Sequence, residues 1–353
     1  MMLCTGIELR RGPTLALTLA ATLACAGPVA AQAISGRVLA SENGQPLTAA
    51  VVTLVDSAGS ERRAMLSDSA GRFRLIAPWP GRWHVKAQHI GRTTASATVT
   101  LGPGSSASVE LEASIAPVLL QPLTVSATSQ CQVRPDAREL TAQLWEEARK
   151  AFRVSSLARH ARWFVLQQFD RIIDPRTGQV LTENTHGAGG VGGRPFGLDE
   201  NEEELNELGY VRPVGEDWSF SVPDDDILLS DGFLDHHCIE FQGGRHRPAR
   251  GLVGVAFRPM QTSRSDIAGV VWLDAASAEV RSVRFHFTGL GWDVPDDALG
   301  GGLDFMKLGS GAIVTRRWYL RVPRGRRPTY QIIETGGELV DPEASGKPVA
   351  PGM

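Results

Sequence analysis

The sequence predicts a mainly β protein built from two units. Short runs of β-branched and apolar residues recur along most of the chain, and turn residues separate them. Glycine and proline are abundant, with 38 and 21 residues among 353, which favours strands joined by turns over a helical bundle. A chain of this length is expected to form about two domains. We predict a seven-stranded antiparallel β-sandwich, then an antiparallel β-sheet domain with one or two helices.

Residues 1–31 have the pattern of a secretory signal peptide. Two arginines precede the apolar run of residues 15–26, and small residues follow it up to Ala31, after which we expect cleavage. The alternative is a lipoprotein signal cleaved before Cys25, but such sites usually place leucine three residues before the cysteine. We therefore expect a periplasmic or secreted protein.

Two cysteines, Cys131 and Cys238, remain after this cleavage. An even pair in an oxidising compartment indicates one disulfide. That bond would close a loop of about 100 residues and stabilise the fold by roughly 4–5 kcal/mol in the chain-entropy model. Two reduced buried thiols or a metal site stay open as alternatives.

Residues 32–113 contain about seven short strands, as in an antiparallel sandwich. The continuous β-branched run at residues 50–55 is typical of a buried strand. Phe73 and Leu75 share one face by the period of two, and so do Trp83 and Val85. The other expected strands cover residues 34–39, 63–67, 98–101 and 108–111.

The turns of this segment form an ordered series of short motifs. They are Gly36-Arg37-Val38, Gln45-Pro46-Leu47, Ala50-Val51, the turn from Asp68 to Phe73, and Pro80-Gly81 with Trp83. This series resembles the carboxypeptidase regulatory-like domain. The resemblance implies a transthyretin-like sandwich that is not itself catalytic and that serves exported proteins as a structural or recognition accessory, and sandwiches related to that family are carbohydrate-binding-like. Asp68 is expected to bond its own turn, with calcium binding as the alternative.

A linker at residues 114–134 and an amphipathic helix at residues 135–153 follow. Asp136 is the expected N-cap, with Glu139 three residues later. We expect the helix to brace the second domain, and binding to a partner helix stays open as an alternative. Its apolar stripe consists of Leu140, Leu144, Ala148, Ala151 and Phe152.

Residues 154–340 form the predicted β-rich domain, and residues 341–353 a flexible tail. In the strand at 279–287, Phe285 is expected on one face and Arg284 on the other. The domain resembles the curved half-barrels of periplasmic lipoprotein carriers, and other antiparallel sheets stay open. Its other expected strands cover residues 163–173, 179–182, 252–257, 266–273, 301–307, 312–322 and 329–334, and residues 228–238 resemble a family of exported proteins without an assigned activity.

Three motifs contain the residue types of a known cofactor or metal site but lack the neighbouring elements or spacing that such a site needs. Residues 187–192 match the dinucleotide fingerprint, but no buried strand leads directly into them, so we interpret them as a surface loop. Residues 235–238 hold metal-ligand residue types, yet zinc needs three or four ligands and the other histidines lack paired spacing. The aspartates at 224–226 lack the alternation of a calcium-binding loop. We expect no metal and no cofactor.

Five aromatic residues are the candidate ligand-facing side chains. Aromatic rings on one sheet face can stack on a sugar or line an apolar cavity, and the alternative is that they fill the core. They are Trp272, Phe285, Trp292, Trp318 and Tyr319.

The overall composition narrows the choice of function. The 36 basic residues against 39 acidic ones give a net charge of −3, which argues against a nucleic-acid partner. No apolar run reaches the about 20 residues of a membrane span, and we find no hydrolase motif. We therefore expect a non-enzymatic exported binding or scaffolding protein of the cell envelope, with an envelope protein or glycan as partner. The alternatives are a carbohydrate-binding protein and a periplasmic carrier of lipid or another apolar ligand.

Overall fold

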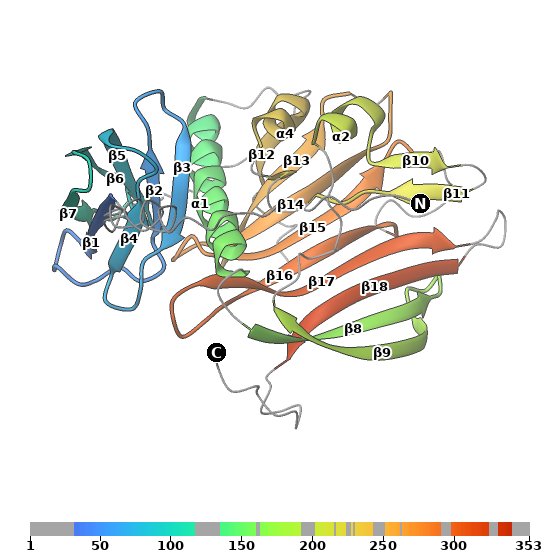
Figure 1. Cartoon of the computed structure of the whole chain (residues 1–353). Coiled ribbons are helices and arrows are strands. Elements are labelled where there is room, and N and C mark those ends of the chain that lie inside the picture. The colour runs from blue at the N-terminus through green and yellow to red at the C-terminus, as the bar shows by residue number, and fades with distance from the viewer. Residues whose placement is uncertain are drawn as a thin grey trace, which may run out of the picture.

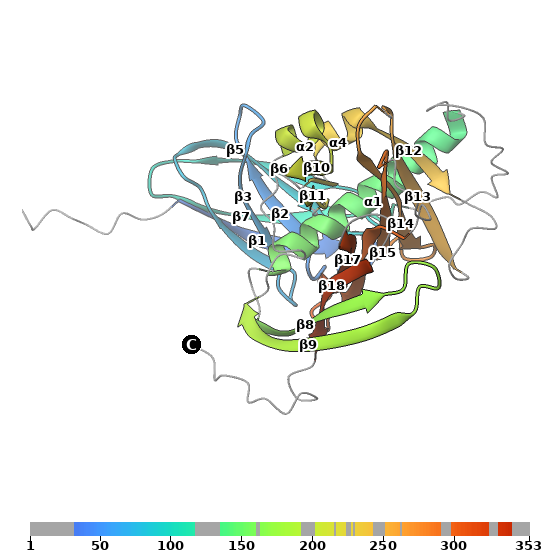
Figure 2. The same cartoon turned by 90° about the vertical axis from the view of Figure 1, so that its right-hand side faces the viewer.

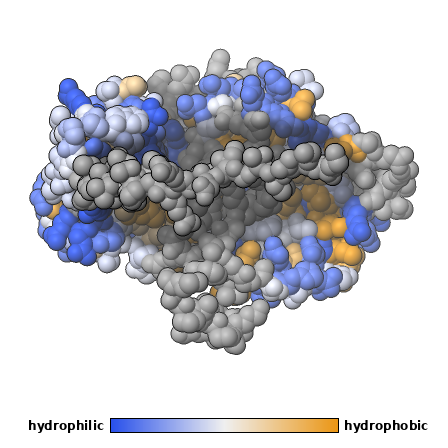
Figure 3. All heavy atoms as spheres, viewed as in Figure 1, coloured by the Kyte–Doolittle hydropathy of each residue, from blue (hydrophilic) through white to orange (hydrophobic). Residues whose placement is uncertain are grey.

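A small β-sandwich, a long helix and a large curved sheet make up the molecule (Figure 1). The computed structural model describes residues 32–116, 135–159, 163–191, 202–214, 217–223, 227–228, 230–242, 251–261, 263–290, 298–324 and 331–340. The mainly β prediction is confirmed. In the face that Figure 3 presents, the sandwich end is mainly hydrophilic, and hydrophobic patches lie at the end of the large sheet.

The predicted sandwich is confirmed, with one difference in strand direction. Its sheets have the orders β4-β1-β7 and β3-β2-β5-β6. β1 and β7 pair in parallel, whereas we expected only antiparallel pairs. The preceding strand β6 lies in the other sheet, so no hairpin fixes the direction of β7. The strands are β1 (Ala33–Ala40), β2 (Val51–Val55), β3 (Glu61–Leu66), β4 (Arg72–Ile76), β5 (Gly81–Gln88), β6 (Ala95–Leu101) and β7 (Ser106–Ala113).

The second unit is a nine-stranded sheet with the order β12-β13-β14-β15-β16-β17-β18-β8-β9. All its neighbouring strands pair antiparallel, which confirms the predicted antiparallel sheet. The strands are β8 (Trp163–Ile173), β9 (Val180–Val191), β12 (His237–Gln242), β13 (Leu252–Pro259), β14 (Asp266–Asp274), β15 (Val280–Thr288), β16 (Gly300–Lys307), β17 (Ile313–Arg324) and β18 (Gln331–Val340).

Helix α1 (Pro135–Arg159) begins before the predicted N-cap and continues beyond the predicted end. Asp136 therefore lies inside the first turn, where Pro135 occupies the opening position that tolerates the missing N–H of proline. The predicted apolar stripe is confirmed, since its five residues, including Leu140, are at most 5% exposed.

Helix α1 packs against both units (Figures 1 and 2). Ala49 and Val51 of the sandwich belong to the same buried cluster as Phe152 of α1 and Phe285 of the sheet. The rings of Phe152 and Phe305 lie 5.7 Å apart. The helix thus joins the two units through one continuous core, whereas the sequence predicted that it braces the second domain and gave no sign of its contact with the sandwich.

Several shorter elements complete the large unit. A short acidic helix, α2 (Glu202–Leu208), is followed by a hairpin of β10 (Val211–Val214) and β11 (Asp217–Phe220). Helix α4 (Asp231–His236) leads into β12. None of the helices in the described ranges is long and apolar enough to cross a bilayer.

The glycine-rich motif lies in a strand, so our interpretation of it as a surface loop is wrong for residues 187–191. These residues are the end of β9 and pair with β8, with Gly187 opposite Gln167 and Val191 opposite Trp163. A sheet ladder is made by backbone groups, and glycine keeps both its N–H and its carbonyl. Gly192 lies outside the described residues.

Candidate functional site

The structure describes four of the five predicted aromatic residues and distributes them over both faces of the large sheet. Phe285 is 5% exposed and lies in the core beside α1, and Trp318 packs against that core. Tyr319 follows Trp318 in the strand and therefore faces away from α1. Trp272 also faces away, since its neighbour Val271 belongs to the core. Trp292 lies outside the described residues.

The face turned away from α1 carries a group of side chains that the sequence did not reveal. Cross-strand register brings Tyr319 of β17 level with Gly302 of β16 and Gly336 of β18. Gly336 in turn lies opposite Phe169 of β8. We name the group the arginine–aromatic patch, and it consists of Phe169, Arg171, Arg284, Arg317, Tyr319, Arg321 and Glu334.

Glycines let the two rings of the patch lie close to the sheet. A Cβ atom added to Gly302 would stand 2.8 Å from Cε1 of Tyr319, and one added to Gly336 would overlap Cζ of Phe169. Both rings therefore occupy space that a side chain on the neighbouring strand would fill. Because these two glycines have no side chain, each ring can pack directly over the backbone of the neighbouring strand.

Each ring is flanked by two guanidinium groups. Arg284 and Arg321 lie 5.8 and 5.2 Å from the centroid of Tyr319. Arg171 and Arg317 lie 4.3 and 5.2 Å from the centroid of Phe169. These distances suit cation–π attraction, which keeps the charged groups on the rings.

A buried carboxylate ties the two halves of the patch together. Glu334 is 3% exposed and accepts hydrogen bonds from Arg171 at 2.9 Å and Arg321 at 2.7 Å. Arg171 also donates to Glu183 at 2.9 Å. That bond lowers the pKa of Glu183 and raises the pKa of Arg171. Glu334 and Glu183 thus fix the direction in which Arg171 points.

Arg317 is the least satisfied arginine of the patch. Arg284 forms an ion pair with Asp304, whereas Arg317 forms none within the described part of the chain. Its Nε atom is buried without a hydrogen-bond partner. A guanidinium has five N–H donors, and because Nε is buried, an external acceptor would bind the two terminal NH2 groups of Arg317. The patch can hold an oxygen-rich anion but contains no nucleophile–base pair.

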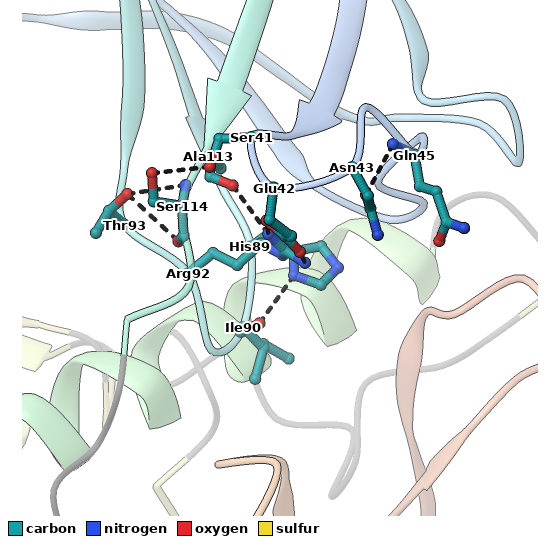
Figure 4. A network of polar contacts seen from close by, with 10 residues as sticks. All are labelled: Ser41, Glu42, Asn43, Gln45, His89, Ile90, Arg92, Thr93, Ala113 and Ser114. Carbon is teal, nitrogen blue, oxygen red and sulfur yellow. Dashed lines mark hydrogen bonds and ion pairs between the residues drawn. The ribbon is translucent and has the colours of Figure 1, made fainter.

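A second polar network lies where the sandwich meets α1 (Figure 4). Arg92, in the turn between β5 and β6, donates to Glu42 at 2.6 Å and to the carbonyl of Ala113 at 2.9 Å. The hydrogen bond from Arg92 lowers the pKa of Glu42 to about 2. The turn, which joins two strands of one sheet, is thereby fixed to the β4-β1-β7 sheet of the sandwich.

The same turn binds α1 through a buried ion pair. Lys150 donates to Glu147 at 2.7 Å and to the carbonyl of Arg92 at 2.7 Å. Glu147 also accepts from the backbone N–H of Gly91 at 2.6 Å. The side chains of Glu147 and Lys150 are only 5% and 9% exposed. The two charges and the backbone groups of the turn therefore provide one another's hydrogen bonds in a place that water does not reach.

His89 lies at this junction in a mainly cationic environment. Its ring contacts the carbonyl of Ile90 at 2.8 Å. Burial lowers the pKa of His89, and the positive charges of Arg92, Lys307 and Lys150 lower it further. Protonation of His89 is therefore unfavourable in the docked arrangement.

The remaining candidates have structural partners where they are described. Cys238 is buried in β12, and Cys131 lies outside the described residues, so their disulfide stays a prediction. His237 is buried against Asp266, a partner that sequence spacing could not indicate. Asp68 accepts from the N–H groups of Ala70 and Arg72, each at 2.8 Å, as expected of a turn residue.

Metal-ligand residue types do not converge in the described part of the chain. No group of three or more histidine, cysteine, aspartate or glutamate residues there could hold a metal ion. His236 closes α4 while His237 opens β12, so residues 235–238 do not form one strand. The aspartates at 224–226 lie outside the described residues.

Comparison with known families identifies the sandwich. Residues 33–114 match the carboxypeptidase regulatory-like domain. This confirms the resemblance for the first unit, and the regulatory-like domain is the sandwich that α1 joins to the large sheet. A search of curated proteins gives no match to the chain.

Solved structures resemble the chain only distantly. The 5-hydroxyisourate hydrolase of Klebsiella pneumoniae is 17% identical, with 24% of this chain and 85% of that chain covered and a TM-score of 0.20. The shaft pilin SpaA of Lactobacillus rhamnosus GG is 12% identical, with 25% and 49% covered and a TM-score of 0.22. A streptococcal ancillary pilin is 9% identical, with 86% and 61% covered and a TM-score of 0.23. Scores this low support no functional inference.

Proposed function

We propose that the protein is an exported, non-enzymatic binding or scaffolding protein of the cell envelope. The observation that carries the proposal is the shared core, in which Ala49 and Val51 of the regulatory-like domain pack with α1 and the large sheet. A domain docked in this way holds the surfaces of both units in one fixed relation, as a scaffold requires. The signal-peptide pattern of residues 1–31 supports export.

Cell fractionation tests this proposal. A tagged full-length chain is expressed in its native cells, and its accessibility to an added protease is compared between intact and permeabilised cells. We expect the mature chain in the envelope or the medium, outside the cytoplasmic membrane. A cytoplasmic pool of unprocessed chain would refute export. Turnover of an envelope substrate that a single point substitution abolishes would refute the non-enzymatic assignment.

A carbohydrate-binding function is the second candidate, and the arginine–aromatic patch favours it. The half-buried ring of Tyr319, which lies beside hydrogen-bonding groups, provides both contacts that saccharides use, stacking and polar bonds. A glycan array that compares the mature protein with its Tyr319→Ala variant tests this candidate. Trp79→Ala is the control, because Trp79 lies in the regulatory-like domain and is 45% exposed. We expect glycan signals that Tyr319→Ala alone weakens, and an empty array would count against the candidate.

A carrier of lipid has less support. The helix-side face of the sheet packs against α1, where Phe152 lies against Phe305 and Leu303 is 3% exposed. An apolar ligand at this place would have to displace the helix. Native mass spectrometry of the purified protein tests the point, and we expect no co-purifying lipid.

A further inference from the structure

We propose that the arginine–aromatic patch binds the carboxylate groups of an acidic polysaccharide. This inference rests on the carbohydrate-binding candidate and names the ligand class of that site. The first support is the fixed orientation of the guanidiniums. Arg171 and Arg321 are held by Glu334 from below and by Phe169 and Tyr319 from the side. Preorganised donors lose little freedom when a ligand binds.

The second support is the charge balance of the surface. Four arginines belong to the patch, and the acids that pair with them are Glu334, Glu183 and Asp304. One positive charge is therefore left over, and Arg317 is the arginine that forms no ion pair within the described residues, although its charge helps to lower the pKa of Glu183. Its planar fork suits a carboxylate, which it can bind with two parallel hydrogen bonds.

The third support concerns the charge density of the ligand. Glu183 and Asp304 stand at the margins of the patch with side chains 42% and 34% exposed. These carboxylates repel a dense polyanion more than a polymer with one charge per sugar. Tyr319 adds a hydroxyl that can donate to or accept from a sugar hydroxyl. A polyuronate therefore fits better than a polyphosphate or a nucleic acid.

Isothermal titration of the mature protein with defined polymers tests the proposal. The probes are polygalacturonate, the same polymer with its carboxyl groups reduced to alcohols, and polyphosphate as the dense anion. The variant is Arg317→Gln, and the control is Arg316→Gln. Arg316 is the neighbouring residue, 58% exposed and paired with Glu338. Thermal melting of each variant confirms that it is folded before titration.

We expect binding of polygalacturonate, no binding of the reduced polymer, and about a tenfold or greater loss in Arg317→Gln, as for one charge-assisted hydrogen bond. Arg316→Gln should bind like the parent. Equal binding of the reduced and acidic polymers would overturn the carboxylate assignment but leave carbohydrate binding intact. Tighter binding of polyphosphate, or equal losses in both variants, would also overturn the inference. Binding of neither saccharide would remove the carbohydrate-binding candidate as well.

Discussion

The imidazole Nε2 of His237 lies 3.1 Å from Oδ1 of Asp266, and both side chains are at most 5% exposed. Nδ1 of the same ring lies 3.0 Å from the carbonyl oxygen of Phe233, and the ring stacks on Phe233 at 3.9 Å. A carbonyl oxygen can only accept, so Nδ1 is the donor there, and Nε2 faces the carboxyl group of Asp266. The pair fastens the junction of α4 and β12 to the start of β14.

Replacing His237 with alanine should therefore be strongly destabilising. The substitution leaves the buried side chain of Asp266 without its imidazole partner, although the N–H of Ile267 still donates to it, and we expect a loss of about 3–5 kcal/mol in the free energy of unfolding. Urea denaturation followed by circular dichroism measures it. His236→Ala is the control, since that ring bonds the backbone carbonyl of Gly232 in its own helix, and about 1 kcal/mol or less is expected. Similar losses in both variants would contradict the structural role of the pair.

The buried ion pair of α1 should be essential for docking of the regulatory-like domain. Glu147→Ala leaves Lys150 buried without its counter-charge and the N–H of Gly91 without an acceptor, so we expect a loss of about 3–5 kcal/mol. Glu146→Ala is the matched control, because Glu146 is 54% exposed and such surface pairs contribute about 0–1 kcal/mol. Urea denaturation compares the two. A parent-like Glu147→Ala would mean that the turn and the helix are not held together by this pair.

His89 should make the folded state sensitive to acid. Its pKa in the folded protein is lowered below the ordinary value of 6.5, so the unfolded chain binds a proton more readily than the native state. Stability is then lost as the pH falls below about 6.5. His89→Gln should reduce this loss between pH 7.5 and pH 5, measured by urea denaturation. His186→Gln, in the exposed part of strand β9, is the matched histidine-to-glutamine control. An unchanged pH dependence in His89→Gln would contradict the prediction.

Gly336 should not tolerate a side chain. An added Cβ would overlap the ring of Phe169 and approach the carbonyl oxygen of Trp318, so Gly336→Ala should cost about 1–3 kcal/mol through overpacking. Gly309→Ala is the control, since nothing lies within 4 Å of the position of its Cβ. Thermal unfolding distinguishes the two variants, and equal melting temperatures would show that the ring of Phe169 does not pack against Gly336.

Local sequence patterns predicted the strands because the periodicity of apolar residues is a property of a single strand or helix and needs no knowledge of its neighbours. The period of two placed Phe285 in the core and Arg284 on the opposite face, and the helical period placed Leu140 and its stripe in contact with the core. The same rule, applied to the aromatic residues, would have separated Trp318 from Tyr319, which are adjacent and therefore face opposite ways.

The contacts that make the candidate site and the junction were beyond such patterns. Phe169 and Tyr319 meet through the register of β8, β18 and β17, and no local signal reports which strands become neighbours. The contact between Val51 and α1 is equally non-local. The glycines of β9 resemble a loop by composition, and only their pairing with β8 makes them a strand.

The most direct test of an exported protein is the intact mass of the chain isolated from its own cells, before and after alkylation. We expect a mature chain that begins at Gln32, with Cys131 and Cys238 alkylated only after reduction. A chain that still carries residues 1–31, with both thiols modified before any reductant is added, would contradict the account.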